Sequence, residues 1–405
     1  MTAPPVPLVG LGDVRAAREL LAGVSRTTPL EGSRALSTAV GGPAYLKCEN
    51  LQRTGSFKIR GAYVRIARLT DAERARGVVA ASAGNHAQGV ALAAQLLGCP
   101  STVFMPQAAP LPKVAATRAY GAQVLLHGTT VDEALREAAR FGERTGAVLI
   151  HPFDHADVIA GQGTVGLEVL EQCPDVRTVV VCTGGGGLVS GIAVALKAQR
   201  PDVHVVAAQA TGAAAFPGSL RAGHPVALDT MTTLADGIAV GRPGEVTFAH
   251  VRDLVDRVVC VDDDAISRAL LLCLERAKLV VEPAGAAAVA AVMQDPGTFE
   301  PPVVAVVSGG NIDPLLLSKV IRHGLIAAGR FLSLRVRIPD RPGELARLLG
   351  VLAASGANVL NVEHQRTGKG LHLDEVEVEL QMETRGRDHG DAVLGQLRAA
   401  TYLLD

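Results

Sequence analysis

The sequence contains no tryptophan, and aromatic residues make up only 3% of its 405 residues. The core must therefore be built mainly from alanine, valine and leucine, which the hydrophobic content of 48% can supply. The formal net charge is only −1, and no cluster of lysine and arginine stands out along the chain. Because nucleic-acid binding depends on clustered positive charge, we expect no nucleic-acid partner.

The cysteines also lack any spacing that would indicate a metal site or a disulfide framework. They are scattered at Cys48, Cys99, Cys173, Cys182, Cys260 and Cys273. The amino terminus has no basic segment followed by an apolar one, so it does not resemble a secretory signal. The longest run of alanine and valine, AGAAAVAAVM at 284–293, is about half as long as a membrane-spanning helix. We expect a cytoplasmic protein with no membrane contact and no bound metal.

Apolar runs typical of strands alternate with helical patterns over most of the chain. Strands are predicted at 78–83, 101–106, 122–128, 178–183, 203–209 and 303–310, and helices at 85–97, 112–120 and 131–145. Strands that are apolar throughout and joined by helices indicate a parallel arrangement covered on both faces. The predicted fold class is α/β.

Three loops follow predicted strands directly: SAGNH at 82–86, TGGGGL at 183–188 and SGGN at 308–311. Ligands of parallel α/β sheets bind at the carboxyl ends of the strands, so these loops are the candidates for a binding site. The four glycines in the second loop open a helix, where backbone N–H groups can surround an anion. A tight turn is the alternative, but four glycines cost much backbone entropy for that alone. The spacing is neither G-x-G-x-x-G nor a P-loop, which favours a compact phosphorylated cofactor over a nucleotide.

The segment NLQRTGSFKIRGA at 50–62 places Lys58 between two apolar residues, Phe57 and Ile59. Taken alone, it is open to two interpretations. In the first, Ser56 caps a helix and Lys58 points at water. In the second, Lys58 is an amine held in an apolar pocket. A lysine, a phosphate-binding loop and a polar loop on one sheet edge are the parts that hold pyridoxal phosphate as a Schiff base.

These motifs together resemble the fold-type II pyridoxal-phosphate enzymes, and within them the threonine dehydratases (threonine ammonia-lyases). The resemblance rests on ENLQRTGSFKIRGA, ASAGNHAQGVA, TGGGGLVSG, LADGIAV, EPAGA and SGGN, which occur in the expected order between residues 47 and 311. It implies a fold like that of the tryptophan synthase β subunit, with parallel sheets and helices on both faces. It also implies that Lys58 is the catalytic lysine and that the cofactor is pyridoxal 5′-phosphate.

The resemblance assigns further roles to matched positions. Cofactor contacts are expected from Phe57, Lys58, Asn85, Gly184, Gly185, Gly186, Gly187, Leu188, Gly237, Glu282 and Ser308. Substrate contacts are expected from Ser82, Ala83, Gly84, Asn85 and His86, mainly through backbone N–H groups that suit a carboxylate. For Gly237 and Glu282, a turn glycine and a surface acid remain the alternative interpretations.

The reaction implied is β-elimination from L-threonine, giving 2-oxobutanoate and ammonia, with L-serine giving pyruvate more weakly. A related lyase that prefers serine or 3-hydroxyaspartate, and an inactive amino-acid sensor, stay open as alternatives. Serine racemases carry a second serine where this chain has Ala83, and metal ligands where it has Gln209 and Ala215. Both differences weigh against racemisation.

The last part of the chain has a different pattern, with alternating strands. Strands at 331–338, 358–366 and 370–383 and helices at 345–356 and 390–400 give the order βαββα. With its DRPGEL turn, this segment resembles an ACT domain, although the usual last strand is very short or missing. We predict a catalytic domain at 1–325 with two α/β subdomains, and an ACT-like regulatory domain at 330–405. We also expect a homodimer or homotetramer and an amino-acid effector at the second domain.

Overall fold

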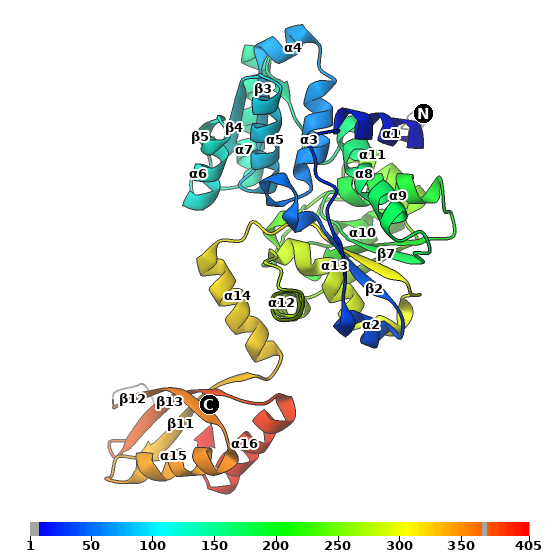
Figure 1. The fold of residues 1–405 in the computed structure, drawn as a ribbon. Coiled ribbons are helices and arrows are strands. Elements are labelled where there is room, and N and C mark those ends of the chain that lie inside the picture. The colour runs from blue at the N-terminus through cyan, green and yellow to red at the C-terminus, as the bar shows by residue number, and fades with distance from the viewer. Residues whose placement is uncertain (1–7, 367–370, 405) are drawn as a thin grey trace. The chain divides into compact units, whose positions relative to one another are not determined.

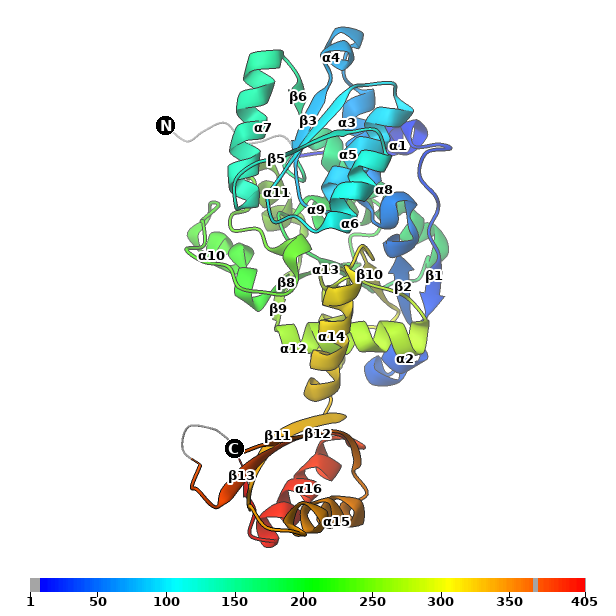
Figure 2. The ribbon, with the colours of Figure 1, turned by 90° about the vertical axis from the view of Figure 1, so that its left-hand side faces the viewer.

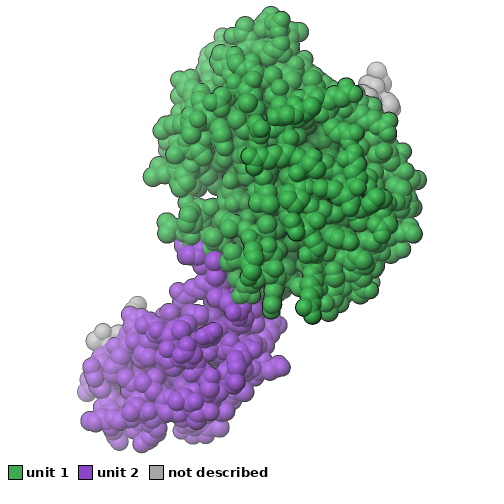
Figure 3. Space-filling view, in the orientation of Figure 1, with its two compact units in different colours: residues 1–317 green, residues 318–405 purple. Residues whose placement is uncertain are grey.

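The computed structural model describes residues 8–366 and 371–404. The chain forms two compact units, residues 1–317 and residues 318–405, which Figure 3 shows in different colours. Each unit has its own sheets and its own hydrophobic core. Within the described residues, no helix combines the length and apolar character that crossing a bilayer requires.

The larger sheet of the first unit carries two of the three candidate loops. Its strands, in spatial order, are β1 (Leu30–Gly32), β2 (Ala44–Cys48), β10 (Val303–Val307), β7 (Thr178–Cys182), β8 (His204–Ala210) and β9 (Arg257–Val261). All neighbours are parallel except β1, which runs antiparallel to β2 at one edge. The two central strands β10 and β7 are buried along their whole length, as expected for a parallel sheet covered on both faces.

The smaller sheet of the first unit carries the third candidate loop. Its strands lie in the order β5 (Gln123–Leu126), β4 (Ser101–Met105), β3 (Val78–Ala81) and β6 (Val148–Leu149), all parallel. The apolar runs of the sequence therefore form two sheets. Strands β1, β2, β6 and β9 were not predicted, and β6 has only two residues.

Helices surround both sheets (Figure 1). They are α1 (Leu11–Leu20), α2 (Arg34–Val40), α3 (Lys58–Ala67), α4 (Asp71–Arg76), α5 (Asn85–Leu96), α6 (Leu111–Ala119), α7 (Val131–Thr145), α8 (Ala156–Gln172), α9 (Gly187–Lys197), α10 (Ala215–Ala222), α11 (Glu245–Leu254), α12 (Asp263–Leu272) and α13 (Pro283–Gln294). Helix α14 (Pro314–Ala327) comes next in the chain, and the division between the two compact units falls within it. The three helices predicted at 85–97, 112–120 and 131–145 correspond to α5, α6 and α7 and are confirmed to within one residue at each end.

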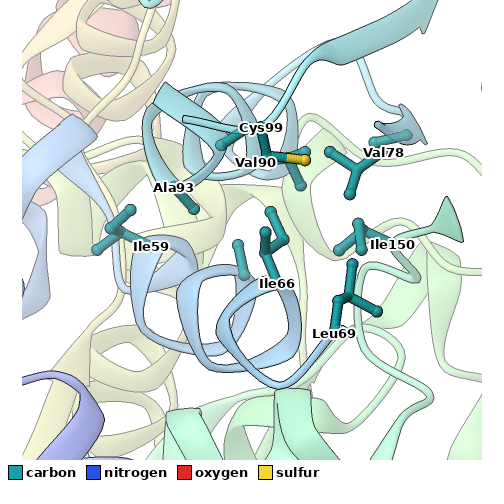
Figure 4. Close-up of a cluster of buried hydrophobic side chains, with 11 residues drawn as sticks. Ile59, Ile66, Leu69, Val78, Val90, Ala93, Cys99 and Ile150 are labelled. Atoms are coloured by element: carbon teal, nitrogen blue, oxygen red, sulfur yellow. The ribbon is translucent and has the colours of Figure 1, made fainter. Parts of the chain in front are cut away.

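The packing of α3 against α5 places the start of α3 beside the smaller sheet. Ile59 and Ile66 of α3 belong to one buried cluster with Val90 and Ala93 of α5 (Figure 4). The two backbones approach closely because Gly89 has no side chain, and a Cβ there would lie 3.1 Å from the Cβ of Lys58. Apolar burial therefore holds the helix that begins at Lys58 in a fixed place.

The second unit has the predicted βαββα order. Its elements are β11 (Phe331–Pro339), α15 (Glu344–Ser355), β12 (Asn358–Gln365), β13 (Glu375–Glu383), α16 (Arg387–Ala399) and β14 (Leu403–Leu404). They form an antiparallel sheet in the order β12-β13-β11-β14, with both helices on one face (Figures 1 and 2). The last strand has two residues and pairs with Val336 and Arg337, as the short chain end led us to expect.

Candidate active site

The three candidate loops and Lys58 meet because strand order reverses in both sheets. In the larger sheet the chain runs outward from β7 to β8 and β9, while β10 lies on the other side of β7. In the smaller sheet it runs from β3 to β4 and β5, while β6 lies on the other side of β3. Ligands of open α/β sheets bind at such reversals, beyond the carboxyl ends of the strands. The loops TGGGGL and SGGN follow β7 and β10, and SAGNH follows β3.

The segment before Lys58 is tied to the SGGN loop by its backbone. Ser56 is extended and forms a β-bridge with Gly309, and the N–H of Phe57 donates to the carbonyl of Ser308 (3.2 Å). Helix α3 then begins at Lys58 with no side-chain cap, because the residue before it, Phe57, is already helical. The interpretation in which Ser56 caps the helix is therefore wrong, and strand-like pairing is what positions the lysine.

Lys58 is partly buried and its amine faces the interior. Its Nζ donates a hydrogen bond to the carbonyl of Pro152 (2.9 Å) and lies 5.2 Å from the centre of the Phe57 ring. Burial lowers the pKa of the Lys58 amine to about 8, with the nearby Cys182 and Glu282 partly opposing it. A positive charge in the first turn of a helix is unfavourable as well. Lys58 therefore has the lowered pKa expected of an amine that works in its neutral form.

The tetraglycine loop forms a turn in which no side chain fits at its first two positions. A Cβ on Gly184 would lie 2.9 Å from the Cα of Ile238, and one on Gly185 would lie 2.4 Å from the Phe153 ring. Gly186 has a φ of 97°, and α9 begins at Gly187. The first N–H groups of a helix, here including that of Leu188, have no partner within the helix. The loop is both closely packed and able to offer amides to an anion, which fits a phosphate group.

Ser308 and Cys182 lie side by side at the ends of the adjacent strands β10 and β7. Their Oγ and Sγ atoms are 3.0 Å apart, and both residues are buried. Burial raises the pKa of the Cys182 thiol to about 11, so this cysteine stays protonated. A protonated thiol can donate to Ser308 Oγ and leave the serine hydroxyl free to donate to a ligand atom.

Glu282 is buried, so the alternative of a surface acid is wrong. Its Oε1 accepts a hydrogen bond from Asn85 Nδ2 (2.5 Å). Burial, followed by the charge of Asp236, raises the pKa of the Glu282 carboxyl to about 7. Gly309 makes room for this contact, because a Cβ there would lie 2.2 Å from Oε1 of Glu282.

The predicted substrate loop SAGNH lies where β3 gives way to α5. Ser82 Oγ accepts from the N–H of Gly84 (3.1 Å), and Ala83 and Gly84 are partly buried. His86 is buried, and its Nε2 is 2.8 Å from the carbonyl of Ile150. Burial, with Lys58 adding to it, lowers the pKa of His86 to about 3. The neutral His86 side chain is thus engaged with the backbone. The N–H of Ser82 also donates, to the carbonyl of Phe104 (3.1 Å), so the loop N–H groups that remain for a carboxylate are those of Ala83 and Asn85.

Gly237 is less central than the other predicted residues. It lies in a short 3₁₀ turn at Asp236–Ile238, where a Cβ would meet that of Ala284 at 2.9 Å. Glu282 Oε1 is 4.0 Å from the same position. Gly237 therefore borders the pocket and is also a turn residue, so both interpretations of this position agree with the structure.

Several residues of this site gave no usable signal in the sequence. Pro152 and Phe153 contact Lys58 and Gly185, although they follow a strand of only two residues that carries no recognisable pattern. Cys182 was read only as one of the scattered cysteines. Asn311 was part of the SGGN motif but received no role. A search for polar residues at the ends of adjacent strands would have found Cys182.

The positions that hold a metal in racemases are engaged differently here. Gln209 Oε1 accepts from the N–H of Phe216 (3.0 Å), and its Nε2 donates to the carbonyl of Thr183 (3.3 Å). Ala215 offers no ligand atom. Among the residues that the structure describes, no group of three or more histidine, cysteine, aspartate or glutamate side chains is placed to hold a metal ion.

Two α/β sheets with a buried lysine and a glycine-rich loop between them define a pyridoxal-phosphate site, and comparison with known proteins agrees. Residues 22–309 match the family described as pyridoxal-phosphate dependent enzyme, and residues 332–400 match the ACT domain. The chain belongs to the pyridoxal-phosphate dependent enzyme family and carries a carboxyl-terminal ACT domain.

Individual relatives are similar over most of the chain. It is 48% identical to the L-threonine ammonia-lyase of Thermotoga maritima over 395 residues, which is 98% of each protein. It is 44% identical to the catabolic L-threonine dehydratase of Escherichia coli K12 over 315 residues, 77% of this chain and 96% of that one. Maize serine racemase is a structural relative, with a TM-score of 0.74 and 39% identity over 79% of this chain and 99% of the racemase.

Proposed function

We propose that this protein uses pyridoxal 5′-phosphate to deaminate L-threonine by β-elimination, giving 2-oxobutanoate and ammonia, and acts more weakly on L-serine to give pyruvate. The observation that carries this proposal is the Lys58 amine. The pKa of this amine is lowered to about 8, and the nearby Cys182, which ends the strand before the tetraglycine turn, and Glu282 both act on it. Relatives named L-threonine ammonia-lyase and L-threonine dehydratase support the choice of threonine.

The residues around Lys58 fit the parts of the cofactor. The amides that follow Gly184 to Gly187, including that of Leu188, would hold the phosphate, and Ser308 would meet the pyridine nitrogen. Asn85 would donate to the phenolic oxygen, and Phe57 would shield the reacting carbon from water. Bound in this way, pyridoxal phosphate supplies an electron sink for the electron pair left when the Cα–H bond breaks. A serine at the pyridine nitrogen leaves the ring neutral, which is enough when a hydroxyl group leaves at once.

Lys58 would act as the base that removes the Cα proton. Its lowered pKa leaves a substantial neutral fraction near neutral pH, and neutral amine is the form that can accept a proton. The Pro152 carbonyl accepts a hydrogen bond from Nζ (2.9 Å) and can hold the amine close when it is not bonded to the cofactor. The N–H groups of Ala83 and Asn85 would hold the substrate carboxylate, because those of Ser82 and Gly84 already donate to the Phe104 carbonyl (3.1 Å) and to Ser82 Oγ (3.1 Å). Ala83 itself offers no side-chain acid or base.

The substrate preference that this chemistry predicts can be tested with a keto-acid assay on L-threonine, L-serine and 3-hydroxyaspartate. We expect threonine to give the highest kcat/KM, and L-serine to yield pyruvate with negligible D-serine, because Ala83 cannot return a proton to the opposite face. EDTA should leave the activity unchanged. D-serine formed as fast as pyruvate would contradict this account. A preference for serine or 3-hydroxyaspartate would identify the related lyase, and turnover of none of them would favour an amino-acid sensor.

We also propose that residues 330–405 form a regulatory domain and that the catalytic domain ends near residue 325. The two compact units divide within α14, and placing the domain boundary at the end of this helix, near Ala327, keeps the helix whole. A cavity of about 250 Å³ at the DRPGEL turn is lined by Ile338, Pro339, Asp340, Arg341, Pro342, Leu345, His364 and Arg366. Charges of both signs beside apolar side chains suit a free amino acid.

The edge strands of the second unit suggest how copies of the chain would associate. Strand β12 is an edge of its sheet, and Leu360 within it is 55% exposed. Exposed sheet edges are commonly covered by another strand or subunit, which supports a homodimer or homotetramer. We further propose a cytoplasmic location, and isoleucine as the effector if the enzyme is biosynthetic.

Truncation after Ala328 tests regulation. We expect the shortened enzyme to keep threonine turnover, because the first unit has its own core, and to lose any response to isoleucine or valine. The full-length enzyme should change its apparent affinity for threonine by about 5- to 150-fold when a saturating effector is present. Kinetics of both forms, with each amino acid added in turn, measure this. A full-length enzyme that responds to none of them would show that the second domain has only a structural role.

A further inference from the structure

Asn311, the last residue of the SGGN loop, links three segments of the candidate site. Its Nδ2 donates to the backbone carbonyl of Thr54 (2.5 Å), four residues before Lys58, and to Oδ1 of Asn85 (2.8 Å) at the start of α5. Asn85 Nδ2 in turn donates to Glu282 (2.5 Å). A chain of hydrogen bonds thus runs from the lysine segment through two amides to a buried carboxyl group.

The carbonyl of Thr54 decides which atom donates and which accepts in this series of hydrogen bonds. A backbone carbonyl can only accept, so the atom of Asn311 that faces it must be the NH₂ group. The same NH₂ faces Asn85, so Asn85 must present its oxygen there and its NH₂ on the other side. If either amide were turned over, two acceptors or two donors would face each other.

The backbone around Thr54 is built to receive this side chain. Thr54 has a φ of 63°, which is uncommon for a residue with a branched side chain, and Gly55 has a φ of 69°. A Cβ on Gly55 would lie 2.4 Å from Oδ1 of Asn311, so only glycine leaves room for it. The N–H of Gly310 also donates to the carbonyl of Gly55 (2.9 Å). Strained backbone of this kind persists only where its surroundings fix it.

The carboxyl group of Glu282, at the other end of the series, cannot decide by itself which end of the Asn85 amide faces it. The pKa of Glu282 is raised to about 7, mainly by burial, so near neutral pH this group exists in both protonation states. A protonated carboxyl can donate or accept, and it could pair with either end of the Asn85 amide. Thr54 and Asn311 therefore supply the constraint that Glu282 lacks.

We propose that Asn311 is a positioning residue that fixes the orientation of the Asn85 amide, so that Asn85 offers a hydrogen-bond donor, and no acceptor, to the cofactor. The inference rests on the proposed function, because it gives Asn85 the cofactor's phenolic oxygen as its ligand. With Oδ1 taken by Asn311 and one N–H taken by Glu282, the remaining N–H of Asn85 is free for an acceptor oxygen.

The test is Asn311→Asp, which keeps the shape of the side chain but removes both donors. The matched control is Asn50→Asp. Asn50 is more buried than Asn311, lies beside Gly310 of the SGGN loop and likewise donates to a backbone carbonyl, that of Val280 (3.1 Å), without touching Asn85. We expect N311D to weaken binding of pyridoxal phosphate to the apoprotein by roughly tenfold or more and N50D by less than about threefold. Absorbance titration measures the affinity, and thermal unfolding of the apoproteins shows whether both lose similar stability. If N311D does not fold, Asn311→Ala replaces it, with the same expected direction.

A double-mutant cycle with Asn85→Ala separates positioning from general damage. If Asn311 acts through Asn85, the N85A/N311D protein should bind the cofactor no more weakly than N85A alone. Losses that multiply, or N311D affinity within twofold of the wild type, would overturn the inference while leaving the proposed function intact. A wild-type protein that neither binds pyridoxal phosphate nor releases keto acid would overturn both.

Discussion

Lys58→Ala is expected to abolish threonine deamination and the visible absorbance that develops when pyridoxal phosphate binds. The change removes both the amine that bonds to the cofactor and the base that takes the Cα proton. General-base catalysis alone contributes about 10²- to 10⁴-fold, so kcat should fall by at least roughly a thousandfold. Keto-acid release and absorbance spectra of the purified variant measure the two effects.

The fold of this variant should persist, because Lys58 is partly exposed and alanine favours the helix that begins there. Lys197→Ala is a suitable control. The Lys197 amine also donates to a backbone carbonyl, that of Val203 (2.8 Å), but it lies at the far end of α9 from the tetraglycine loop. Threonine turnover by K58A at the rate of K197A would refute the assignment of Lys58.

The second large effect is expected from a buried group of charged side chains that includes Arg60, two residues beyond Lys58. Arg60 binds Glu49 (2.8 Å) and Glu168 (2.6 Å), and Lys47 binds the second oxygen of Glu168 (2.6 Å). All four side chains are almost completely removed from solvent, and their charges balance. They join β2 and the short turn after it to α8 and to α3, the helix that begins at Lys58.

Arg60→Met is therefore expected to destabilise the first unit by about 3–5 kcal/mol. Methionine fills a similar volume, but two buried carboxylates would then share the single charge of Lys47. The cost arises from the uncompensated charge, because an intact buried pair adds little net stability by itself. The urea midpoint of the first unit's unfolding transition measures the change.

Arg18→Met gives the matched control for this experiment. Arg18 pairs with Glu171, on the same helix α8 as Glu168, but both side chains are about half exposed. Exposed pairs contribute less than about 1 kcal/mol, so R18M should unfold near the wild-type midpoint. Equal midpoints for R60M and R18M would show that the buried charges are not needed for stability.

Local patterns in the sequence were sufficient to predict the long helices and the central strands. Helix α7 was predicted at 131–145 and has those limits, because Thr130 and Glu133 form a capping box and Gly146 ends the helix in the left-handed region. The central strands β7 and β10 were found because they are short apolar runs rich in valine. These signals lie within a few residues of each other and need no distant partner.

Strands β1 and β6, which are short and lie at sheet edges, escaped prediction for the same physical reason. Strand β6 has two residues and β1 has three, too few to show a period of two. Their existence depends on pairing with β3 and β2, whose positions are fixed by the rest of the fold. Two α/β subdomains were expected from the family resemblance, but the apolar pattern could not assign each strand to one of two sheets, because all of the strands carry the same pattern.

The sequence by itself determined which residues could hold the cofactor: Lys58 between apolar neighbours, a run of four glycines, and polar loops after buried strands. Only the tertiary structure decided how they act together. It buried Lys58 and Glu282 and so moved their pKa values towards neutrality, and it engaged the His86 ring with a backbone carbonyl. It also brought Asn311 to Asn85, 226 residues away in the chain. Burial and amide orientation depend on groups that are distant in sequence, so no local pattern can encode them.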